Sequence, residues 1–337
     1  NNDDDDDDEL LESLNSFLIE KINNKLNNKK NIDDLDKYDI KYDELIDNDS
    51  NDHYNYFYNL KKYKKKKYLN EIIRLKKFKS NDIPLKFRIL NSKMNTYIKS
   101  TALYYVDKLN EMEPSNSEYA KLYQWIDGLI NIPFNIYKLL PINNNSNIFD
   151  KQLFLKNTKN TLDNAIYGHH DAKLHILQVI SKWIINPNSG GNVLAIQGPM
   201  GNGKTTLVKE GIAKAINRPF SLIALGGASD ASYFNGHNFT YEGSRCGKII
   251  DILIKSKCMN PIIYFDELDK LSETFKGDEI SHLLTHITDS SQNTIFNDNY
   301  FHGINIDLSK VLFIFSFNDE NKIDKILKDR MYIINTN

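Results

Sequence analysis

Residues 198–205 read Gly198-Pro199-Met200-Gly201-Asn202-Gly203-Lys204-Thr205, which fits the phosphate-loop pattern G-x-x-x-x-G-K-[ST]. The short apolar run Asn192 to Gln197 precedes it, and Thr206 to Ile216 has the pattern of a helix. Glycines let successive backbone N–H groups converge on phosphate oxygens at a helix N-terminus, where the helix dipole favours negative charge. The sequence therefore predicts a nucleotide site on a strand, a loop and a helix.

Within this loop, two side chains have specific predicted roles. Lys204 would reach the β- and γ-phosphates of ATP, and the Thr205 hydroxyl would ligate Mg²⁺. The remaining predicted nucleotide-binding residues are Gly198, Pro199, Met200, Gly201, Asn202, Gly203 and Thr206. The alternative is a glycine-rich turn before an ordinary helix, but the full pattern arises by chance in roughly one chain of this length in a hundred.

A second apolar run, Pro261 to Phe265, ends in the two carboxylates Asp266 and Glu267. A buried strand delivers such side chains to the carboxyl edge of an open α/β sheet, where ligands bind. Asp266 would hold Mg²⁺, usually through water, and Glu267 would polarise the water that attacks the γ-phosphate. Many strands end in an acidic residue, so the pair alone is weak evidence for a catalytic site. It becomes strong evidence because it follows a phosphate loop.

Two further residues are candidates for catalysis. The run Val311 to Phe317 leads into Asn318, whose amide could orient the attacking water, although a turn-forming Asn explains it equally well. Arg330 precedes the last apolar run and could neutralise transition-state charge. If its side chain points away from its own site, it must act on the nucleotide of a neighbouring subunit; the alternative is an ordinary surface arginine.

Strands and helices alternate after the phosphate loop. The strand-like runs are Phe220 to Leu225, Pro261 to Phe265, Val311 to Phe317 and Met331 to Ile334. This alternation predicts an α/β fold with a parallel sheet and helices on both faces.

The chain divides into three predicted segments. Residues 1–80 are low in complexity and are expected to be disordered or loosely helical, with helical periodicity from Leu10 to Ile22. Residues 81–150 form a helical region, and 151–337 the α/β domain. Three histidines lie close together at its start, but no carboxylate or cysteine completes a known metal-ligand spacing around His169, His170 and His175.

Composition limits the class of protein. The net charge is −2, from 43 basic and 45 acidic residues, so the overall charge of the protein does not favour binding to nucleic acid. The basic run Lys61 to Lys79 leaves nucleic acid or a protein partner as an alternative. The two cysteines, Cys246 and Cys258, make no disulfide framework, and no apolar run reaches the ~20 residues that span a bilayer. We expect a cytoplasmic protein in a reducing compartment, with no membrane partner.

From about residue 158 to 337, the sequence resembles an AAA+ ATPase and, more narrowly, the ATPase module of Lon-type proteases. The matching segments are 221–230, Gly236-His237, Thr240-Tyr241, 247–250, 266–270, Gly277-Asp278, 307–311 and 329–331, and 117–140 is similar to the helical linker of that family. The resemblance implies a P-loop domain with a parallel sheet in the order 5-1-4-3-2. It also implies the roles given above for the phosphate loop, Asp266, Glu267, Asn318 and Arg330.

Further roles rest on the resemblance alone. It implies a hexameric ring that hydrolyses ATP with Mg²⁺ to unfold and translocate protein substrates. Tyr167 and Gly168 fall where the adenine pocket of the family begins. Tyr241 matches the aromatic residue of the first pore loop, which grips an unfolded polypeptide. Phe275 and Lys276 fall where a second pore loop is expected.

The sequence departs from the family in two ways. Glu242 follows Tyr241 where the family has an aliphatic residue, and this charge should weaken an apolar grip. The sequence ends after the fifth predicted strand, and neither a small helical subdomain nor a Ser-Lys peptidase domain follows. The alternatives are therefore the ATPase portion of an ATP-dependent serine protease whose peptidase part is absent or on a separate chain, and a weakly hydrolysing, nucleotide-dependent remodelling protein.

Overall fold

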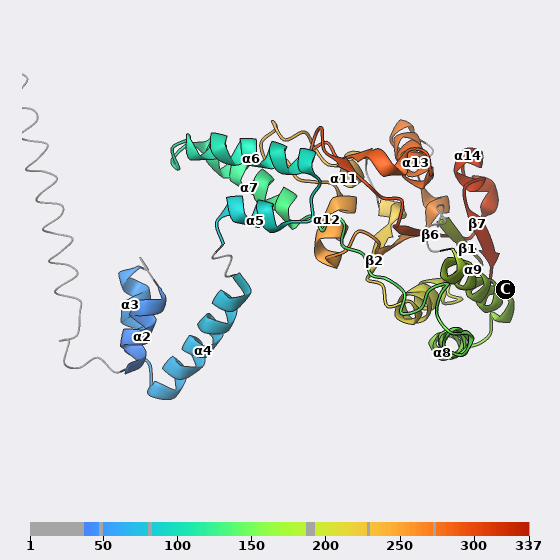
Figure 1. The fold of residues 1–337 in the computed structure, drawn as a ribbon, viewed down its shortest axis with the longest axis horizontal. Helices are drawn as coiled ribbons and strands as arrows, with labels where there is room; N and C mark the ends of the chain where they lie inside the picture. The colour runs from blue at the N-terminus through green and yellow to red at the C-terminus, as the bar shows by residue number, and fades with distance from the viewer. Residues whose placement is uncertain are drawn as a thin grey trace, which may run out of the picture. The chain divides into compact units, whose positions relative to one another are not determined.

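The computed structural model describes residues 37–46, 50–79, 83–186, 193–227, 230–271 and 274–336. The chain consists of two compact units, residues 1–83 and 84–337 (Figure 1). The predicted helical periodicity of Leu10 to Ile22 lies outside the described residues. Across the described ranges, every helix is too short or too polar to cross a membrane.

The first unit contains the helices α2 (Lys37–Leu45), α3 (Asn51–Tyr58) and α4 (Lys62–Lys79). They share a small aromatic core in which the rings of Tyr42 and Phe57 stack with centroids 4.0 Å apart. One lysine of the basic run, Lys65, is buried against the Asp39 carboxylate at 2.6 Å. The segment that we expected to be disordered or loosely helical thus includes a packed three-helix element within residues 37–79.

The second unit begins with α5 (Leu85–Asn91), α6 (Thr96–Asn110) and α7 (Ser117–Asn131). Asparagine side chains cap the last two helices, since Asn95 accepts the N–H of Ile98 and Asn116 that of Glu118. Their apolar faces pack with the core of the α/β region, where the Trp125 indole N–H donates to the Tyr300 carbonyl at 2.9 Å. The helical segment and the α/β segment therefore belong to one unit.

Five parallel strands form the central sheet, in the order β2-β3-β6-β1-β7. Their bounds are β1 Val193–Gln197, β2 Phe220–Ala224, β3 Ile262–Asp266, β6 Leu312–Phe317 and β7 Tyr332–Asn335. This order confirms the predicted 5-1-4-3-2 arrangement. A small antiparallel pair, β4 (Phe296–Asn297) and β5 (Asn305–Ile306), is an addition that we did not predict.

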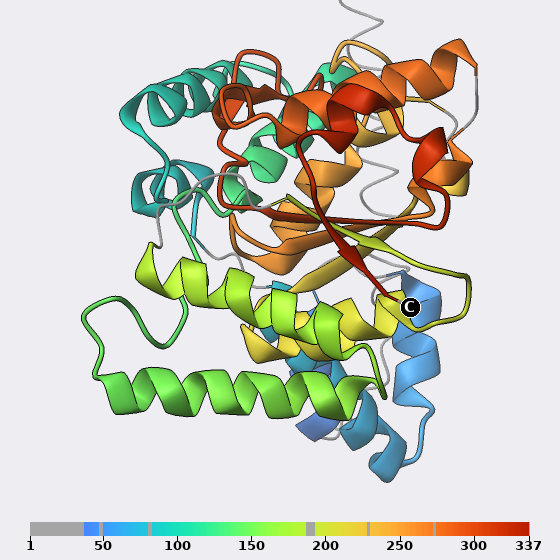
Figure 2. The same cartoon turned by 90° about the vertical axis from the view of Figure 1, so that its right-hand side faces the viewer.

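The two faces of the sheet bury different helices (Figure 2). Alternate strand residues point to opposite faces. Leu194, Tyr264 and Ile314 pack with α8 (Ile148–Ala165), α9 (His170–Ile185) and the π-helical turns η2 (Leu207–Ala213). Ala195, Phe265 and Phe315 pack with α5–α7, α12 (Lys248–Ser256) and α13 (Phe275–Thr288), and the rings of Phe265 and Phe315 stack at 4.9 Å. The central strands are covered on both sides, as a parallel sheet requires.

Short elements complete the unit. They are α10 (Lys204–Thr206), η3 (Leu225–Gly227), α11 (Ser232–Asn235), η4 (Leu268–Lys270), η5 (Asn293–Ile295), η6 (Glu320–Lys322) and α14 (Lys325–Lys328). Between α7 and α8, residues 132–147 have no regular structure and run past the start of β3. There Asn260 fixes this segment, because its side-chain amide exchanges two hydrogen bonds with the Lys138 backbone, at 2.8 and 2.9 Å.

Candidate active site

The phosphate loop follows β1 at the carboxyl edge of the sheet, as predicted. Gly198 extends the pairing of β1, because its N–H donates to the Phe317 carbonyl at 3.3 Å. A Cβ added at Gly198 would lie 2.2 Å from Oγ1 of Thr336, so only glycine fits at this crossing. Gly201 and Gly203 have φ values of 75° and 83°, in the left-handed region that favours glycine.

A side-chain seam joins the loop to the end of β7. The Asn202 side-chain amide donates to both the carbonyl and the hydroxyl of Thr336, at 2.9 and 2.8 Å. The Thr336 hydroxyl in turn donates to the Gln197 carbonyl at 2.8 Å. These bonds fix the loop before a ligand binds. The sequence motif does not reveal this seam, because Thr336 is far away in the chain.

Lys204 points into the turn of the loop. Its ammonium donates to the carbonyls of Gly198 and Pro199 at 2.8 and 2.9 Å and to Oδ1 of Asn318 at 2.9 Å. Burial lowers the pKa of Lys204, while the charges of Asp266 and Asp269 act in the opposite direction. A partly desolvated cation held by three oxygens is poised to exchange some of them for phosphate oxygens.

Asp266 ends β3 next to the Thr205 hydroxyl, with 3.5 Å between Oδ2 and Oγ1. Ser316 of β6 donates a hydrogen bond to Oδ1 of Asp266, and the buried Tyr264 hydroxyl lies 3.4 Å from Oγ1 of Thr205. Hydroxyl and carboxylate oxygens are the ligands that Mg²⁺ prefers, usually together with water and substrate phosphates. Thr205 and Asp266 therefore fit the Mg²⁺ site that the sequence predicts. Sequence reasoning missed the two supporting hydroxyls.

Glu267 has a left-handed backbone with φ 61°, which is unusual for a residue other than glycine. Its N–H donates to Oδ1 of Asp266 at 3.1 Å and its side chain is exposed to solvent. A Cβ added at Gly226, after β2, would lie 2.9 Å from Oε2 of Glu267. The strained backbone thus aims the carboxylate across the edge of the sheet, and such strain is common at active sites.

These groups surround one cavity of 380 Å³. Its lining consists of residues 200–206, Asp266, Glu267, Ser316, Phe317 and Asn318. The structure thus brings together predicted phosphate, metal and catalytic residues from three separate strand ends. Among the described residues, no group of three or more His, Cys, Asp or Glu side chains is arranged to hold a metal ion.

Tyr167 and Gly168 do not line this cavity. The Tyr167 side chain is 98% exposed, and Gly168 has φ 75° in the turn between α8 and α9. Their neighbours make the contacts instead, since the His169 ring nitrogen Nε2 lies 3.0 Å from the Asn202 carbonyl and Ile166 packs against Gly203. The adenine role of Tyr167 and Gly168 stays a prediction.

Arg330 also lies outside the cavity lining. Its guanidinium pairs with Asp289 at 2.9 Å and donates to the Thr285 carbonyl at the end of α13. The side chain retains 28% exposure. Arg330 therefore makes no contact with the groups that line this cavity, and its catalytic role stays a prediction.

The predicted pore-loop residues are exposed. Tyr241 is 67% exposed, Glu242 beside it is also exposed, and Phe275 at the start of α13 is 77% exposed. The loop that carries Tyr241 closes at its base, where the His237 N–H donates to the Arg245 carbonyl at 3.2 Å. Large aromatic side chains that are exposed to solvent are available to a partner, and the pore-loop role stays a prediction.

Asp298 supports the loop that carries Tyr241, which runs from Gly236 to Gly247. This fully buried carboxylate accepts the N–H of Gly247 at 2.8 Å and that of Tyr300 at 2.9 Å. A Cβ added at Gly236 would lie 2.8 Å from Oδ1 of Asp298. Asp298 thus joins both ends of the loop to the hairpin region after β4. Sequence reasoning missed this residue.

Asp298 should make the stability of the protein depend on pH. Burial raises its pKa from 3.8 to about 6, although backbone N–H groups oppose the rise. Between these two values the folded protein retains a proton that the unfolded chain has released. The free energy of unfolding therefore falls as pH rises through this range, by up to about 3 kcal/mol from this group.

The Asp298→Asn variant cannot ionise at this position, so its unfolding free energy should fall less steeply across the same range. Urea unfolding at several pH values between 3.8 and about 6 measures both slopes. Asp278→Asn, at an exposed position, is the matched control and should retain the slope of the unaltered protein. Equal slopes for Asp298→Asn and the unaltered protein would show that Asp298 ionises normally.

Comparison with known proteins defines the class. The sequence profile described as "AAA: ATPase family associated with various cellular activities (AAA)" matches residues 194–336. This range includes the five strands of the central sheet, except for the first residue of β1. Residues 194–336 are thus an AAA domain, and the resemblance to AAA+ ATPases is confirmed.

Its homologues are Lon proteases. The chain is 35% identical over 269 residues to a Lon protease homolog of Acanthamoeba polyphaga mimivirus, covering 78% of this chain and 26% of that protein. It is 40% identical over 227 residues to "Lon protease homolog, mitochondrial 1" of Dictyostelium discoideum, covering 67% of this chain and 22% of that protein. It is 35% identical over 248 residues to Lon protease 1 of Bacillus subtilis, covering 74% of this chain and 30% of that protein. The chain therefore spans less than a third of the length of these relatives.

Proposed function

We propose that this chain binds ATP with Mg²⁺ and hydrolyses it at the cavity between the phosphate loop and the ends of β3 and β6. The observation that carries the proposal is the convergence of Lys204, Asp266 and Glu267 on a single cavity. A site that only bound nucleotide would need a cation and a metal ligand, but it would not need a second carboxylate on a strained backbone.

Each residue has a role in this reaction. Lys204 binds the terminal phosphates, while Thr205 and Asp266 hold Mg²⁺, which neutralises phosphate charge when bound. Glu267 takes a proton from the attacking water as general base. Asn318, which bonds Lys204 at 2.9 Å, orients that water once Lys204 has turned to the phosphates.

Phosphate release from ATP, measured with Mg²⁺ and with EDTA, tests the proposal. We expect release with Mg²⁺, none with EDTA, and a marked loss in Thr205→Val, which removes one metal ligand while keeping the shape of the side chain. Thr294→Val is the matched control, because Thr294 is exposed and does not line the cavity. Release that is the same in EDTA and in both variants would place the reaction elsewhere.

We further propose that the active site is completed by a second copy of the chain, in a ring. The supporting observation is that Arg330 lies outside the cavity of its own subunit and pairs with Asp289 at the end of α13. In this arrangement Arg330 leaves Asp289 and stabilises the transition state on the nucleotide of the neighbour.

Mixing two inactive variants tests this arrangement. Arg330→Ala subunits retain Glu267, and Glu267→Gln subunits retain Arg330. We therefore expect each variant alone to be inactive and their mixture to recover turnover, because some interfaces join an intact Glu267 to an intact Arg330. Activity of Arg330→Ala alone, equal to that of the unaltered protein, would contradict the proposal.

The work coupled to hydrolysis is proposed to be the unfolding and threading of protein substrates. The exposed aromatic residues Tyr241 and Phe275 support this role, as does the name "Lon protease" of the relatives. Proteolysis would then come from a part of the protein beyond this sequence or from a separate chain. An increase in turnover with an unfolded protein, lost in Tyr241→Ala, would support threading; equal stimulation of the variant would exclude Tyr241 from the grip.

A further inference from the structure

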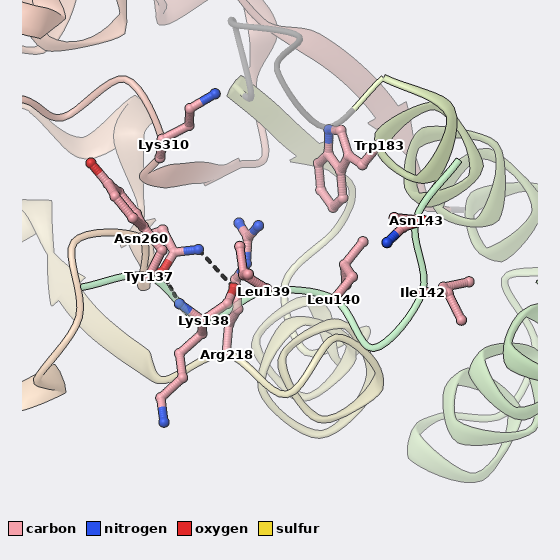
Figure 3. Close-up of a pocket in the computed structure, with 10 residues that line it drawn as sticks. All are labelled: Tyr137, Lys138, Leu139, Leu140, Ile142, Asn143, Trp183, Arg218, Asn260 and Lys310. Atoms are coloured by element: carbon pink, nitrogen blue, oxygen red, sulfur yellow. Dashed lines mark hydrogen bonds between the residues drawn. The ribbon is translucent and has the colours of Figure 1, made fainter. Parts of the chain in front are cut away.

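A second cavity lies at the amino edge of the sheet, opposite the nucleotide site (Figure 3). Its volume is 460 Å³, within the range of small-molecule sites. Arg218, Asn260 and Lys310 line it, and each precedes one strand of the sheet: β2, β3 and β6. The strands between the two edges are about 17 Å long at about 3.3 Å per residue, so the two cavities are separate.

The segment that joins α7 to α8 forms one wall of this cavity. Leu139, Leu140 and Ile142 contribute its apolar side chains, and Trp183 of α9 faces them from the opposite side (Figure 3). The Asn260 amide bonds described above fix this wall to the start of β3. The cavity therefore has a preformed apolar part.

Arg218 is the unusual group in the cavity. Its backbone N–H ends the helix that follows the phosphate loop by donating to the Ala213 carbonyl at 3.0 Å. The side chain turns inward, with the guanidinium carbon 5.9 Å from the centroid of the Trp183 ring. Figure 3 shows the guanidinium pointing into the space between Trp183, Lys310 and Tyr137.

The guanidinium has no acidic partner among the described residues. Its Nε and Nη1 atoms are buried and make no hydrogen bond. Among the described residues, Cys258 is the titratable group whose charge would raise the pKa of Arg218, but burial raises the pKa of that thiol, so it is neutral at pH 7. Burial lowers the pKa of Arg218, yet an arginine remains charged in proteins.

Two buried guanidinium nitrogens without a hydrogen bond are costly, because these atoms have lost their water and gained no acceptor. Among the described residues that line the cavity, none is acidic. The site is therefore complementary to an anion. Arginine holds a carboxylate or a phosphate with two parallel hydrogen bonds.

We propose that this cavity binds an organic carboxylate, whose acid group pairs with Arg218 and whose apolar part lies against Trp183, Leu140 and Ile142. The apolar wall favours a singly charged acid on an apolar body over a strongly hydrated phosphate. The carboxylate belongs either to a free organic acid or to the C-terminal residue of a polypeptide, since both present the same chemistry.

Calorimetric titration of the full chain tests the proposal. The probes are 3-phenylpropanoate and its neutral amide, the dipeptide acetyl-Ala-Phe with a free acid or an amidated terminus, and inorganic phosphate. We expect at least one acid to bind, and its amide to bind about tenfold more weakly or worse, because the charged pair is lost. If 3-phenylpropanoate binds more tightly, the ligand is a free acid; if the dipeptide acid does, it is a polypeptide C-terminus.

Arg218→Met retains the length and the apolar contact of the side chain but removes its charge. It should weaken binding of the acid by about tenfold or more. Arg74→Met is the matched control, because Arg74 is 71% exposed, and it should change affinity by less than about twofold. ATP binding by Arg218→Met shows whether the variant is folded. If the variant does not fold, the comparison of acid and amide on the unaltered chain tests the proposal. The proposal is overturned if no acid binds, if phosphate binds instead, or if acid and amide bind equally.

Discussion

The Glu267→Gln variant is expected to bind ATP as the unaltered protein does and to lose turnover by about 10²- to 10⁴-fold, the usual contribution of a general base. The side chain is exposed to solvent beside the cavity, so the amide fits in the same place without burying a new polar group. Steady-state phosphate release gives turnover, and a fluorescent ATP analogue gives affinity. The pair of measurements separates chemistry from binding.

Glu111→Gln is the matched control for this experiment. Glu111 is exposed at the end of α6, in the helical part of the same unit, and does not line the cavity. We expect this variant to retain both affinity and turnover. If Glu267→Gln retains turnover within about tenfold, Glu267 is not the base, since an aligned general base contributes at least about 10²-fold.

The second large effect is expected from Lys204→Met, which should weaken ATP binding by about 10- to 100-fold. The estimate follows from the roughly 1.5–3 kcal/mol that a hydrogen bond to a charged group contributes. Without a ligand, the ammonium holds Asn318 and the carbonyls of Gly198 and Pro199, so the substitution also releases these oxygens. Turnover at saturating ATP should fall as well, because the variant lacks the positive charge that Lys204 brings to the terminal phosphates.

Lys209→Met is the control for charge, because its side chain is 60% exposed on the helix that follows the loop. It should bind ATP about as tightly as the unaltered protein, since an exposed cation contributes little. Equal affinity of Lys204→Met and the unaltered protein would mean that Lys204 does not reach the phosphates. The phosphate loop would then be a structural turn.

Local sequence patterns were enough to predict the sheet and the position of the phosphate loop. The glycines of residues 198–203, followed by Lys204, demand one backbone shape, and the apolar runs before Asp266 and Asn318 are long enough to be recognised as buried strands. Because carboxyl ends of parallel strands meet at one edge, the strand order alone places these side chains together.

Contacts between distant segments could not be predicted in this way. The seam between Asn202 and Thr336 joins residues far apart in the chain, and the loop support from Asp298 depends on a buried carboxylate that looks like a turn residue in the sequence. Arg218 has no sequence signature either, since an arginine before a proline is ordinary. Its importance comes from two buried guanidinium nitrogens that make no hydrogen bond with the described residues, which only packing reveals.

We propose that this AAA protein hydrolyses ATP at sites that are shared between subunits. The most direct test is the rate of ATP turnover per subunit, measured against protein concentration for the unaltered chain, Glu267→Gln and Arg330→Ala. We predict that the rate per subunit rises with concentration and levels off for the unaltered chain, and that both variants stay inactive at every concentration. Tight ATP binding without turnover at any concentration would contradict the account.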